Sequence, residues 1–311
     1  MISIITALYN RLDLSTRFLA SLEAHPPSAS WEIIWVDDGS TDGTRDWLLT
    51  LPAPRHRVIL NDRNLGYAAS NNRGAQAATG EILALLNNDL VLTPGWFLPM
   101  HATLDQHPQA GVIGNVQRNA VTGEIDHSGV YYYARGRPTH DRVLPDGGSR
   151  IRPVIAVTAA CMLMKRERFH QLGGFDEQFI NGSEDVDLCL RSRAAGWQNL
   201  VALDSIVHHH VSASPGRSLH NQRNGYLLMR RWQKILPDLA AESWREVPLR
   251  DLWEAKLTGF AWLAARLTRR WHRHPGQTCP RWMKRNVTAL VARQLARWHR
   301  LFPEIKATSS R

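Results

Sequence analysis

The chain opens with ISIITALYN at residues 2–10, and EIIWVDDGSTDGT follows at residues 32–44. Each stretch is a short apolar run that stops at polar residues, which is typical of a strand buried in a parallel sheet. A helix pattern over about residues 14–24 joins them. The alternation continues with strands expected at residues 57–61 and 81–87 and helices expected at about 41–49 and 68–78. This succession of βαβ units predicts an α/β fold with a mainly parallel central sheet.

Beyond Pro94 the pattern changes to longer connections. We expect a small antiparallel element near residues 128–134, one strand formed by VIAVTAACMLM at 154–164, and a helix that begins near Glu184. From about residue 252 onward, two helical stripes of apolar residues predict a C-terminal helical segment. Their members are Leu257, Phe260, Ala264, Leu267 and Trp271, and then Met283, Val287, Leu290, Val291, Leu295, Trp298 and Leu301.

The composition fits a soluble or peripheral protein. Of the 311 residues 43% are hydrophobic, enough for the core of one large domain with an accessory segment. Cys161, Cys189 and Cys279 lack the spacing of a zinc site or a disulfide framework, which indicates a reducing compartment. The N-terminal residues resemble a strand and not a signal peptide, and no apolar window approaches the roughly 18 residues of a spanning helix. We therefore expect a cytoplasmic protein.

The excess positive charge lies in the C-terminal tail. Residues 250–311 carry 14 Lys and Arg against three acidic residues, whereas the other 249 residues carry 24 against 25. Tryptophans alternate with arginines in this tail, which suits an anionic membrane surface, although stripes that pack on the body explain the pattern nearly as well. No nucleic-acid-binding motif accompanies the charge, so no nucleic acid is expected as a partner. The tryptophans are Trp253, Trp262, Trp271, Trp282 and Trp298.

Polar residues stand where the first strands are expected to end. In open α/β sheets the ligand binds at the carboxyl ends of the strands, which makes these residues candidates for binding. They are Tyr9, Asn10, Asp37, Asp38, Asn61 to Asn64 and Asn87 to Asp89. The stretch VDDGSTDGT at 36–44 allows two interpretations. It caps a helix, or its carboxylates accept hydrogen bonds from a base edge or a ribose.

Two further motifs could contact a diphosphate. NLGYAASNNRG at 64–74 has small residues that allow close backbone approach, with Arg63 or Arg73 beside it, although an ordinary loop before a helix has the same pattern. LLNNDLVLTPGW at 85–96 puts Asp89 where a hard divalent cation could bind, although a simple turn also explains it.

An acidic cluster precedes a predicted helix within GGFDEQFINGSEDVDLCLRSRAAGW at 173–197. A helix dipole favours acidic residues in the first turn, but three in four positions exceed what capping requires. One of these carboxylates in a cleft could act as a general base. The cluster consists of Asp176, Glu184, Asp185 and Asp187.

Three consecutive histidines, His208 to His210, follow the apolar run VALDSIV. Side chains alternate along a strand, so the three cannot all face one way. Either His209 or the pair of His208 and His210 is expected to face the cleft.

In this order the motifs resemble glycosyltransferase family 2, whose members have the GT-A fold, and they look most like its bacterial rhamnosyltransferase-like branch. The resemblance covers about residues 3–216. It implies a GT-A (Rossmann-like) catalytic domain at 1–216, with a nucleotide-sugar-binding half at 1–100 and an acceptor and catalytic half at 101–216. Residues 217–311 then form a basic, Trp-rich helical extension.

The resemblance implies a metal site and a donor site. The family's Asp-x-Asp motif corresponds to residues 87–89, where Asn87 replaces the first Asp. Asp89 is then the main carboxylate ligand of a divalent cation, Mn²⁺ or Mg²⁺, and His209 completes the metal shell. The residues implied to bind the nucleotide sugar are Thr6, Tyr9, Asn10, Asp37, Asp38, Arg63, Asn64, Gly66, Asn72 and Asn88.

The family's Glu-Asp motif falls on Glu184 and Asp185, and Asp185 resembles the general base that deprotonates the acceptor. Asp187 and Trp197 are expected on the acceptor side. The implied reaction is the inverting transfer of a sugar from a nucleotide-diphosphate sugar (dTDP-rhamnose or a UDP-sugar) to a saccharide or polyprenyl-linked acceptor in bacterial surface polysaccharide assembly. It would take place in the cytoplasm or at the inner face of the cell membrane, with residues 250–311 against anionic lipid.

Two other functions are compatible with a nucleotide-binding α/β domain. A sugar-nucleotide nucleotidyltransferase would need a Gly-rich N-terminal loop that carries Arg and Lys, whereas the loop here is ALYNRLD. A non-catalytic sugar-binding protein would predict loss of the carboxylates assigned to the metal and to the base, and both are present.

Overall fold

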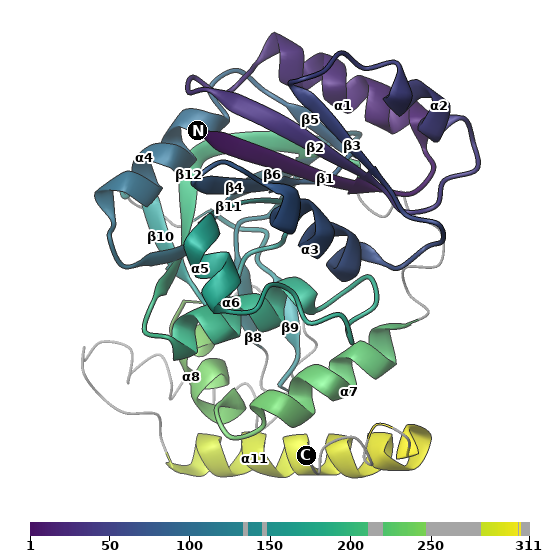
Figure 1. Ribbon diagram of the computed structural model, residues 1–311. Coiled ribbons are helices and arrows are strands. Elements are labelled where there is room, and N and C mark those ends of the chain that lie inside the picture. Colours follow the sequence, from purple (N-terminus) through teal and green to yellow (C-terminus); the bar gives the residue numbers. More distant parts are fainter. Residues whose placement is uncertain (133–135, 145–147, 211–219, 247–280, 304, 306–311) are drawn as a thin grey trace. The chain divides into compact units, whose positions relative to one another are not determined.

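A computed structural model describes the chain except for residues 133–135, 145–147, 211–219, 247–280, 304 and 306–311 (Figure 1). The chain divides into two compact units. Unit 1 consists of Met1–Val130 and His140–Asn224, and unit 2 consists of Tyr131–Thr139 and Gly225–Arg311. All the elements that form the central sheet belong to unit 1.

The first half of the central sheet is parallel, as the alternation predicts. Its four strands lie in the order β4-β1-β2-β3, and β1 pairs in parallel with both β2 and β4. The helices that join them lie within a few residues of the predicted ranges. The bounds are β1 (Ile2–Leu8), α1 (Leu12–Ala24), β2 (Trp31–Asp37), α2 (Thr44–Leu49), β3 (His56–Leu60), α3 (Tyr67–Ala77) and β4 (Ile82–Leu86).

The second half of the sheet contains the antiparallel pairing. β11 (Cys161–Lys165) lies between β4 and β6 (Ala110–Asn119) and is antiparallel to both. β12 (Gln198–His209) then pairs in parallel with β6. Three shorter strands pair antiparallel with this half. They are β5 (Leu90–Leu92) and β10 (Ile151–Val154), which pair with β12, and β7 (Ile125–His127), which pairs with β6.

The prediction of one strand over residues 154–164 is wrong. β10 ends at Val154 and β11 begins only at Cys161, so residues 155–160 leave the sheet in between. All six of these residues are buried, and a uniformly buried apolar run has no period that would distinguish a strand from a buried turn.

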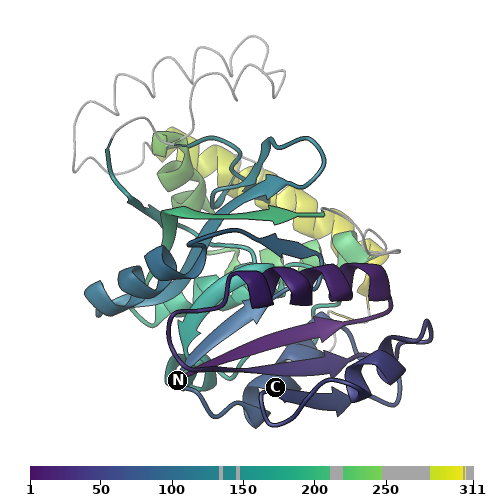
Figure 2. The same ribbon diagram turned by 90° about the horizontal axis from the view of Figure 1, so that it is seen from above.

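Helices cover both faces of the sheet, as Figures 1 and 2 show. Ile4 and Trp35 lie in one apolar cluster with side chains of α1 and of α4 (Phe97–Gln106). The alternate residues Ile5 and Val36 face α3, where a Cβ on Gly74 would lie 2.5 Å from Ile5 Cγ2. Glycine at this position therefore lets α3 pack closely on β1 and β2.

Two further helices of unit 1 pack against the second half of the sheet. α5 (Arg166–Gln171) packs against β11, and α6 (Glu184–Ala194) packs against β6 and β12. α6 begins at the residue where the sequence predicts a helix start. Its first turn carries three acidic residues, which become important in the cleft described below.

Unit 2 is helical apart from a two-stranded sheet of β8 (Val130–Tyr132) and β9 (Pro138–His140). Its helices include the C-terminal part of α7 (Asn221–Trp232), α8 (Leu236–Glu246) and α11 (Arg281–Leu301). The ring of Tyr226 lies 6.2 Å from that of Trp298 and 6.1 Å from that of Phe302. The described C-terminal residues thus form a packed helical segment, as predicted.

The second apolar stripe of the tail faces the interior of unit 2. Val287, Val291, Leu295 and Trp298 are buried, whereas Leu290, predicted on the same stripe, is exposed. Leu301 is exposed as well, because both leucines lie to one side of the buried face. The side chain of Met283 and the first stripe at 257–271 lie outside the described residues. Among the helices that the structure describes, no stretch is long and apolar enough to span a bilayer.

Candidate active site

A cleft opens in unit 1 where β1, β2 and β4 end. Its lining comes from these strand ends, from residues 158–160 in the interruption between β10 and β11, and from the start of α6. Eight residues that the sequence assigns to the site line it: Tyr9, Asp38, Asn64, Asn88, Asp89, Glu184, Asp185 and His209. The strand-end positions and the acidic helix start therefore meet in one place.

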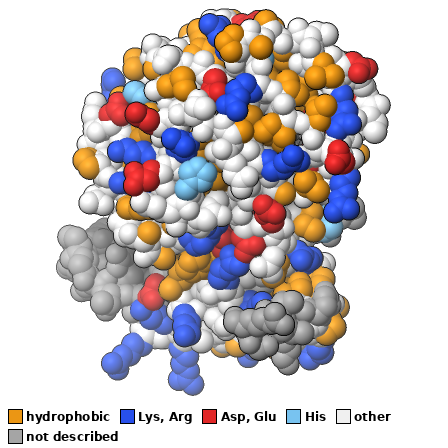
Figure 3. Space-filling view, viewed as in Figure 1, with side chains coloured by type: hydrophobic (Ala, Val, Ile, Leu, Met, Phe, Trp, Pro, Cys, Tyr) orange, Lys and Arg blue, Asp and Glu red, His pale blue; other side chains and the backbone are white. Residues whose placement is uncertain are grey.

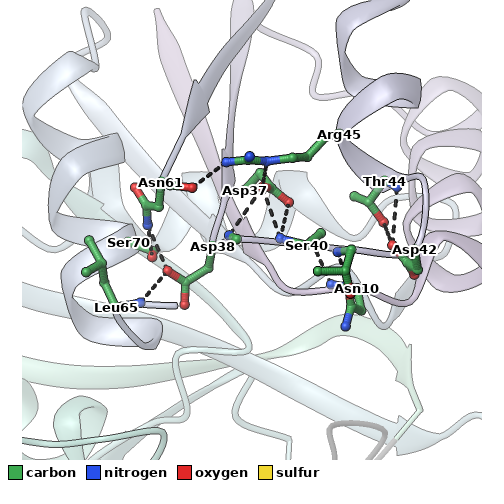
Figure 4. A network of polar contacts seen from close by, with 12 residues as sticks. Asn10, Asp37, Asp38, Ser40, Asp42, Thr44, Arg45, Asn61, Leu65 and Ser70 are labelled. Atoms are coloured by element: carbon green, nitrogen blue, oxygen red, sulfur yellow. Dashed lines mark hydrogen bonds and ion pairs between the residues drawn. The ribbon is translucent and has the colours of Figure 1, made fainter. Parts of the chain in front are cut away.

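Two interpretations were open for the strand-end carboxylates, a structural turn and a binding role, and Asp37 and Asp38 differ in this respect (Figure 4). Asp37 is fully buried and accepts hydrogen bonds from the backbone N–H groups of Gly39 and Ser40. Its Oδ2 also lies 2.7 Å from Nε of Arg45. Asp37 therefore stabilises the turn, whereas Asp38 lines the cleft.

Asp38 holds the next strand end in place. Its Oδ1 accepts from Leu65 N at 2.8 Å and from Asn61 Nδ2 at 2.8 Å, and its Oδ2 accepts from Gly66 N at 2.9 Å. Gly66 contributes a backbone N–H at φ 91°. The carboxylate thus fixes the loop before α3 and faces the cleft from the end of β2.

Asn10 and Arg11 connect the end of β1 to this turn. Asn10 N donates to Ser40 Oγ at 2.7 Å, and Asn10 Oδ1 accepts from Thr41 N at 2.7 Å. Both Asn10 and Arg11 have left-handed backbone conformations, with φ 56° and 62°. Such conformations are strained for residues other than glycine and gather at functional sites. Here they bring Tyr9 and Arg11 into the cleft lining.

Besides Asp37 and Gly66, four more residues assigned to the donor are absent from the described cleft lining. Thr6 is fully buried in β1. Asn72 binds the backbone of Phe175, with Nδ2 donating to its carbonyl at 2.9 Å and Oδ1 accepting from its N–H at 2.9 Å. Arg63 is exposed and is absent from the described lining, as is Asn10, which binds the turn at Ser40 and Thr41. Arg73, the alternative to Arg63, donates to Asn61 Oδ1.

The two residues expected on the acceptor side also lie away from the cleft lining. Asp187 is fully buried, and its Oδ2 accepts from Arg191 Nε at 2.8 Å on the next turn of α6. Trp197 lies just before β12, where the guanidinium of Arg168 stacks 4.8 Å from its ring centroid. Both have structural partners, and neither points to a ligand.

Asp89 and His209 approach each other from adjacent strands. β5 pairs with β12 so that His209 stands opposite Leu90, and His210 N donates to Asp89 O at 2.9 Å. His209 Nε2 lies 3.2 Å from Asp89 Oδ1. Of the three histidines, His209 lines the cleft, whereas His208 and His210 are absent from its described lining.

The polar atoms of this pair suit a cation. Asp89 Oδ1, Asn87 Oδ1 and both ring nitrogens of His209 are buried. Among the described residues none of them has a contact with hydrogen-bond geometry, and this includes the 3.2 Å approach of His209 Nε2 to Asp89 Oδ1. Buried polar atoms are almost always satisfied, so these atoms indicate a missing partner. Among the described residues no group of three His, Cys, Asp or Glu forms a ready-made metal site. A cation here would complete its shell with other oxygens, such as those of a diphosphate.

Asp185 is the partly exposed carboxylate on the opposite wall. Its Oδ2 accepts from Ala159 N at 3.1 Å, and its Oδ1 accepts from Val186 N at 2.8 Å. The adjacent Glu184 is buried and accepts from Gly182 N at 2.6 Å. A general base needs a carboxylate that can reach the acceptor from the wall of the cleft. Of these two acids, Asp185 is the more exposed in the cleft, whereas Glu184 binds the turn before α6.

Several residues of the cleft were missed by the sequence analysis. Tyr67 donates its hydroxyl to Ala159 O at 2.9 Å, and its backbone N–H donates to Asn181 Oδ1 at 3.0 Å. Tyr67, Asn181 and Arg11 all line the cleft. Arg11 directly follows the Tyr-Asn turn and could have been noticed there. Residues 158–160 were hidden inside the strand predicted at 154–164.

His127, on β7, is outside the cleft lining but binds one of its residues, Thr158. Its Nε2 accepts from Thr158 N at 3.3 Å. Complete burial, together with the nearby His140, His209 and Arg152, lowers the pKa of His127 well below its ordinary value. The ring therefore stays neutral at physiological pH, which lets it act as an acceptor.

Comparison with known proteins identifies the family. The model of the family described as glycosyl transferase family 2 matches residues 3–169. The chain belongs to glycosyltransferase family 2. The resemblance inferred from the ordered motifs is thus confirmed.

Relatives of this family 2 chain include proteins of surface polysaccharide synthesis. It is 34% identical over 224 residues to the O-antigen biosynthesis protein RfbC of Myxococcus xanthus, covering 68% of this chain and 17% of that protein. It is 29% identical over 237 residues to the N-acetylglucosaminyl-diphospho-decaprenol L-rhamnosyltransferase of Mycobacterium tuberculosis, covering 65% and 73%. With the protein y4gI of Sinorhizobium fredii it shares 32% identity over 252 residues, 75% of this chain and 28% of that protein. The chain therefore spans less than a third of two of these relatives.

Solved structures confirm the GT-A α/β fold of this family 2 chain. GalNAc-T7 with UDP, GalNAc and Mn²⁺ superposes with a TM-score of 0.58 at 19% identity, over 67% of this chain and 43% of that one. The mannosyltransferase PcManGT of Pyrobaculum calidifontis, in complex with GDP-Man and Mn²⁺, gives 0.53 at 17% identity, over 95% and 86%.

Proposed function

We propose that the chain is an inverting, metal-dependent glycosyltransferase that takes its sugar from a nucleotide-diphosphate sugar. The observation that carries the proposal is the convergence of three groups in one cleft: Asp38 at the end of β2, the Asp89 and His209 pair, and Asp185 at the start of α6. A glycosyltransferase with a nucleotide-diphosphate donor and a cation needs a nucleotide site, a charge-neutralising site for diphosphate and a general base.

Each group has its own task in a single in-line displacement. Asp38 and Tyr9 would bind the nucleoside. Asp89 and His209 would hold a divalent cation, Mn²⁺ or Mg²⁺, which would supply positive charge for the leaving diphosphate. Asp185 removes the proton of the acceptor hydroxyl as its oxygen attacks the anomeric carbon and the bond to the diphosphate oxygen breaks. One displacement inverts the anomeric configuration.

Family membership and the named relatives support a donor and an acceptor class. A rhamnosyltransferase that acts on a diphospho-decaprenol-linked sugar is among the relatives, and two structural neighbours bind UDP or GDP-Man with Mn²⁺. For this chain we propose dTDP-rhamnose or a UDP-sugar as the donor. The proposed acceptor is a saccharide or polyprenyl-linked saccharide of a bacterial surface polysaccharide. Residues 1–100 would bind the donor, residues 101–216 would bind the acceptor, and residues 217–311 would be the extension.

The donor can be tested without knowledge of the acceptor. Thermal unfolding of the chain is measured with a panel of nucleotide sugars, each with and without Mn²⁺, because a ligand that binds the native state raises the unfolding temperature. We expect one donor to stabilise the protein more in the presence of Mn²⁺ than in its absence. If every nucleotide sugar leaves the transition unchanged, the proposed function is wrong.

We also propose that the tail contacts an anionic membrane, through a different face from the one the sequence suggests. The apolar stripe of α11 is buried in unit 2, so its outward face is basic. This face presents five exposed arginines interspersed with exposed alanines, and α11 contains no acidic residue. In Figure 3 basic side chains project from this helix at the lower margin of the view. The arginines are Arg281, Arg285, Arg293, Arg297 and Arg300.

Flotation with liposomes tests the membrane proposal. Each basic residue near an anionic surface contributes about 1 kcal/mol, so the triple substitution Arg293→Gln, Arg297→Gln and Arg300→Gln should weaken binding by on the order of 100-fold. A control that replaces three exposed arginines of unit 1, Arg17, Arg55 and Arg150, removes the same charge and should bind nearly as well as the unaltered protein. Equal binding to neutral and anionic vesicles, or equal loss in both variants, would contradict a role for this face.

A further inference from the structure

We propose that Asp126 is a positioning residue that holds His209 in the orientation and tautomer needed for cation binding. The inference rests on the proposed function, because it concerns the same candidate metal site. It assigns a task to a residue outside the cleft lining, which none of the sequence motifs includes.

Three strands bring the two side chains together. β12 pairs with β6 so that His209 stands opposite Asn119, and β7 folds back on β6 with His127 opposite Gln117. Asp126, the residue before His127, is thereby carried to the far side of the imidazole from Asp89. The side chains of His209 and Asp126 are only 6% and 11% exposed, so solvent hardly competes for the contact.

The imidazole of His209 lies between two carboxylates. Nε2 lies 3.2 Å from Asp89 Oδ1 on the cleft side, and Nδ1 lies 3.9 Å from Asp126 Oδ2 on the other. The second separation is longer than a hydrogen bond, so the contact is an electrostatic one between the carboxylate and the Nδ1 edge of the ring. Neither ring nitrogen has a hydrogen-bond partner within the described residues.

The tautomer of a histidine decides which of its ring nitrogens can bind a cation. Nε2 can donate a lone pair to a cation only when the proton is on Nδ1. Asp89 Oδ1, 3.2 Å from Nε2, favours the opposite tautomer while no cation is bound, so the Asp126 carboxylate near Nδ1 is the group that favours the metal-binding tautomer. Such a partner also fixes the plane of the ring and makes the ligating nitrogen more basic. Asp126 is the carboxylate in position to do so.

Of the two Asp126 carboxylate oxygens, only Oδ2 is in position to face His209. Arg142 Nη2 lies 3.5 Å from Asp126 Oδ1, so Oδ2 is the atom that faces His209. The nearby Asp141 carboxylate is bound 2.7 Å from Arg152, and His127 uses its Nε2 on Thr158 N. Because Asp141 and His127 contact these other groups, Asp126 is the neighbouring residue that can act on Nδ1 of His209.

The test measures Mn²⁺ binding by the full chain in the absence of nucleotide, by titration calorimetry or by the electron paramagnetic resonance signal of free Mn²⁺. Loss of an outer carboxylate partner typically weakens metal affinity 10–100-fold, so we expect that range for Asp126→Asn. Asp204→Asn removes the same charge from an exposed residue on β12 whose partner is Arg150, and should leave Mn²⁺ affinity unchanged.

A double-mutant cycle separates positioning from a general charge effect. If Asp126 acts through His209, Asp126→Asn should have no further effect on Mn²⁺ affinity in a chain that already carries His209→Ala. An undiminished additional loss in that background would overturn the proposal, as would wild-type affinity in Asp126→Asn when His209→Ala binds weakly.

The His209→Ala variant and a folding control distinguish failure of the metal site from failure of the role of Asp126. If His209→Ala itself binds Mn²⁺ like the unaltered chain, the proposed metal site is wrong, independently of Asp126. Metal-free thermal unfolding checks that each variant is folded. If Asp126→Asn does not fold, the smaller substitution Asp126→Ser takes its place in the same cycle, with the same expected result.

Discussion

The backbone N–H of Ala159 donates a hydrogen bond of 3.1 Å to Oδ2 of Asp185. Ala159 belongs to the interruption between β10 and β11, and Asp185 stands in the first turn of α6. The interruption therefore positions the carboxylate that we assign as the general base. Residues 158–160, although buried, also line the cleft next to that carboxylate.

Asp185→Asn should lower the turnover rate by roughly 10²–10⁴-fold, because the amide keeps the shape of the side chain but cannot accept the proton. Donor binding, measured by thermal unfolding, should remain. Asp176→Asn is the matched control: its carboxylate caps the turn at Gln178 N and lies outside the cleft lining, so turnover should stay near normal. Normal turnover of a folded Asp185→Asn variant would rule out the assignment.

Asp38→Asn should weaken nucleotide binding. Its two oxygens accept hydrogen bonds from Leu65 N and Gly66 N. In the asparagine variant an NH₂ group replaces one oxygen, so that one of these backbone N–H groups meets a second donor and loses its acceptor. That clash costs about 1–3 kcal/mol of unfolding free energy. A hydrogen bond to a charged group contributes about 1.5–3 kcal/mol, so loss of the carboxylate as an acceptor for the nucleoside should lower the affinity for UDP or dTDP about 10-fold or more. Calorimetry with the free nucleotide measures this. The exposed neighbour Asp62, changed to Asn, provides a control in which affinity should not change.

Gly39→Ala should destabilise the chain more than Gly95→Ala. Both glycines have positive φ, 84° and 75°, so alanine meets a similar backbone strain of about 1–2 kcal/mol at each. A Cβ on Gly39 would also lie 2.9 Å from the backbone carbon of Arg63, whereas Gly95 has nothing within 4 Å. Urea unfolding should show the larger loss for Gly39→Ala. Equal losses of unfolding free energy in the two variants would mean that the loop after β3 can move to accommodate the added Cβ.

Glu32 should make stability depend on acid pH. Burial opposes its ionisation, but hydrogen bonds from Ser3, Thr79 and Arg57 outweigh burial and lower its pKa from 4.5 to about 2. The folded state therefore prefers the charged carboxylate. The resulting stability, about 3 kcal/mol, is present above about pH 4.5 and is lost as the pH falls toward 2.

The difference between the unaltered chain and Glu32→Gln isolates this effect. Its unfolding free energy should differ by a few kcal/mol at pH 7, and the gap should narrow below about pH 4.5. Glu23→Gln, at an exposed position of α1, should show little difference at either pH. A gap that stays constant from pH 7 to pH 3 would contradict the shifted pKa.

The parallel half of the sheet could be predicted because its strands are short apolar runs closed by polar residues. β1 and β2 match the prediction within one residue, since a buried strand and its polar end leave a sharp boundary in the sequence. The cleft position followed from this, because the carboxyl ends of parallel strands must meet at one edge. Alternation along β12 also limited the histidines to two choices, of which the lining contains His209.

The remaining differences come from long-range packing, which local patterns do not encode. Asn72 lies in the helix after the Asn-Leu-Gly loop at 64–66, where a nucleotide ligand is expected, yet it binds the turn at Phe175 more than 100 positions away. Trp197 and Asp187 each find a nearby arginine. The tail stripe predicts an amphipathic helix correctly, but whether its apolar face meets lipid or protein depends on the rest of unit 2.

The pairing of β5 with β12 has a consequence for how a cation would bind. Asp89 and His209 are 120 positions apart in the sequence, yet backbone hydrogen bonds such as that from His210 N to Asp89 O hold their strands together. Conformational entropy is lost when the chain folds, so little remains to be lost when the cation arrives. Hydrogen–deuterium exchange at the His210 amide should therefore be slow even in metal-free protein, which describes a rigid socket and not a loop that closes on its ligand.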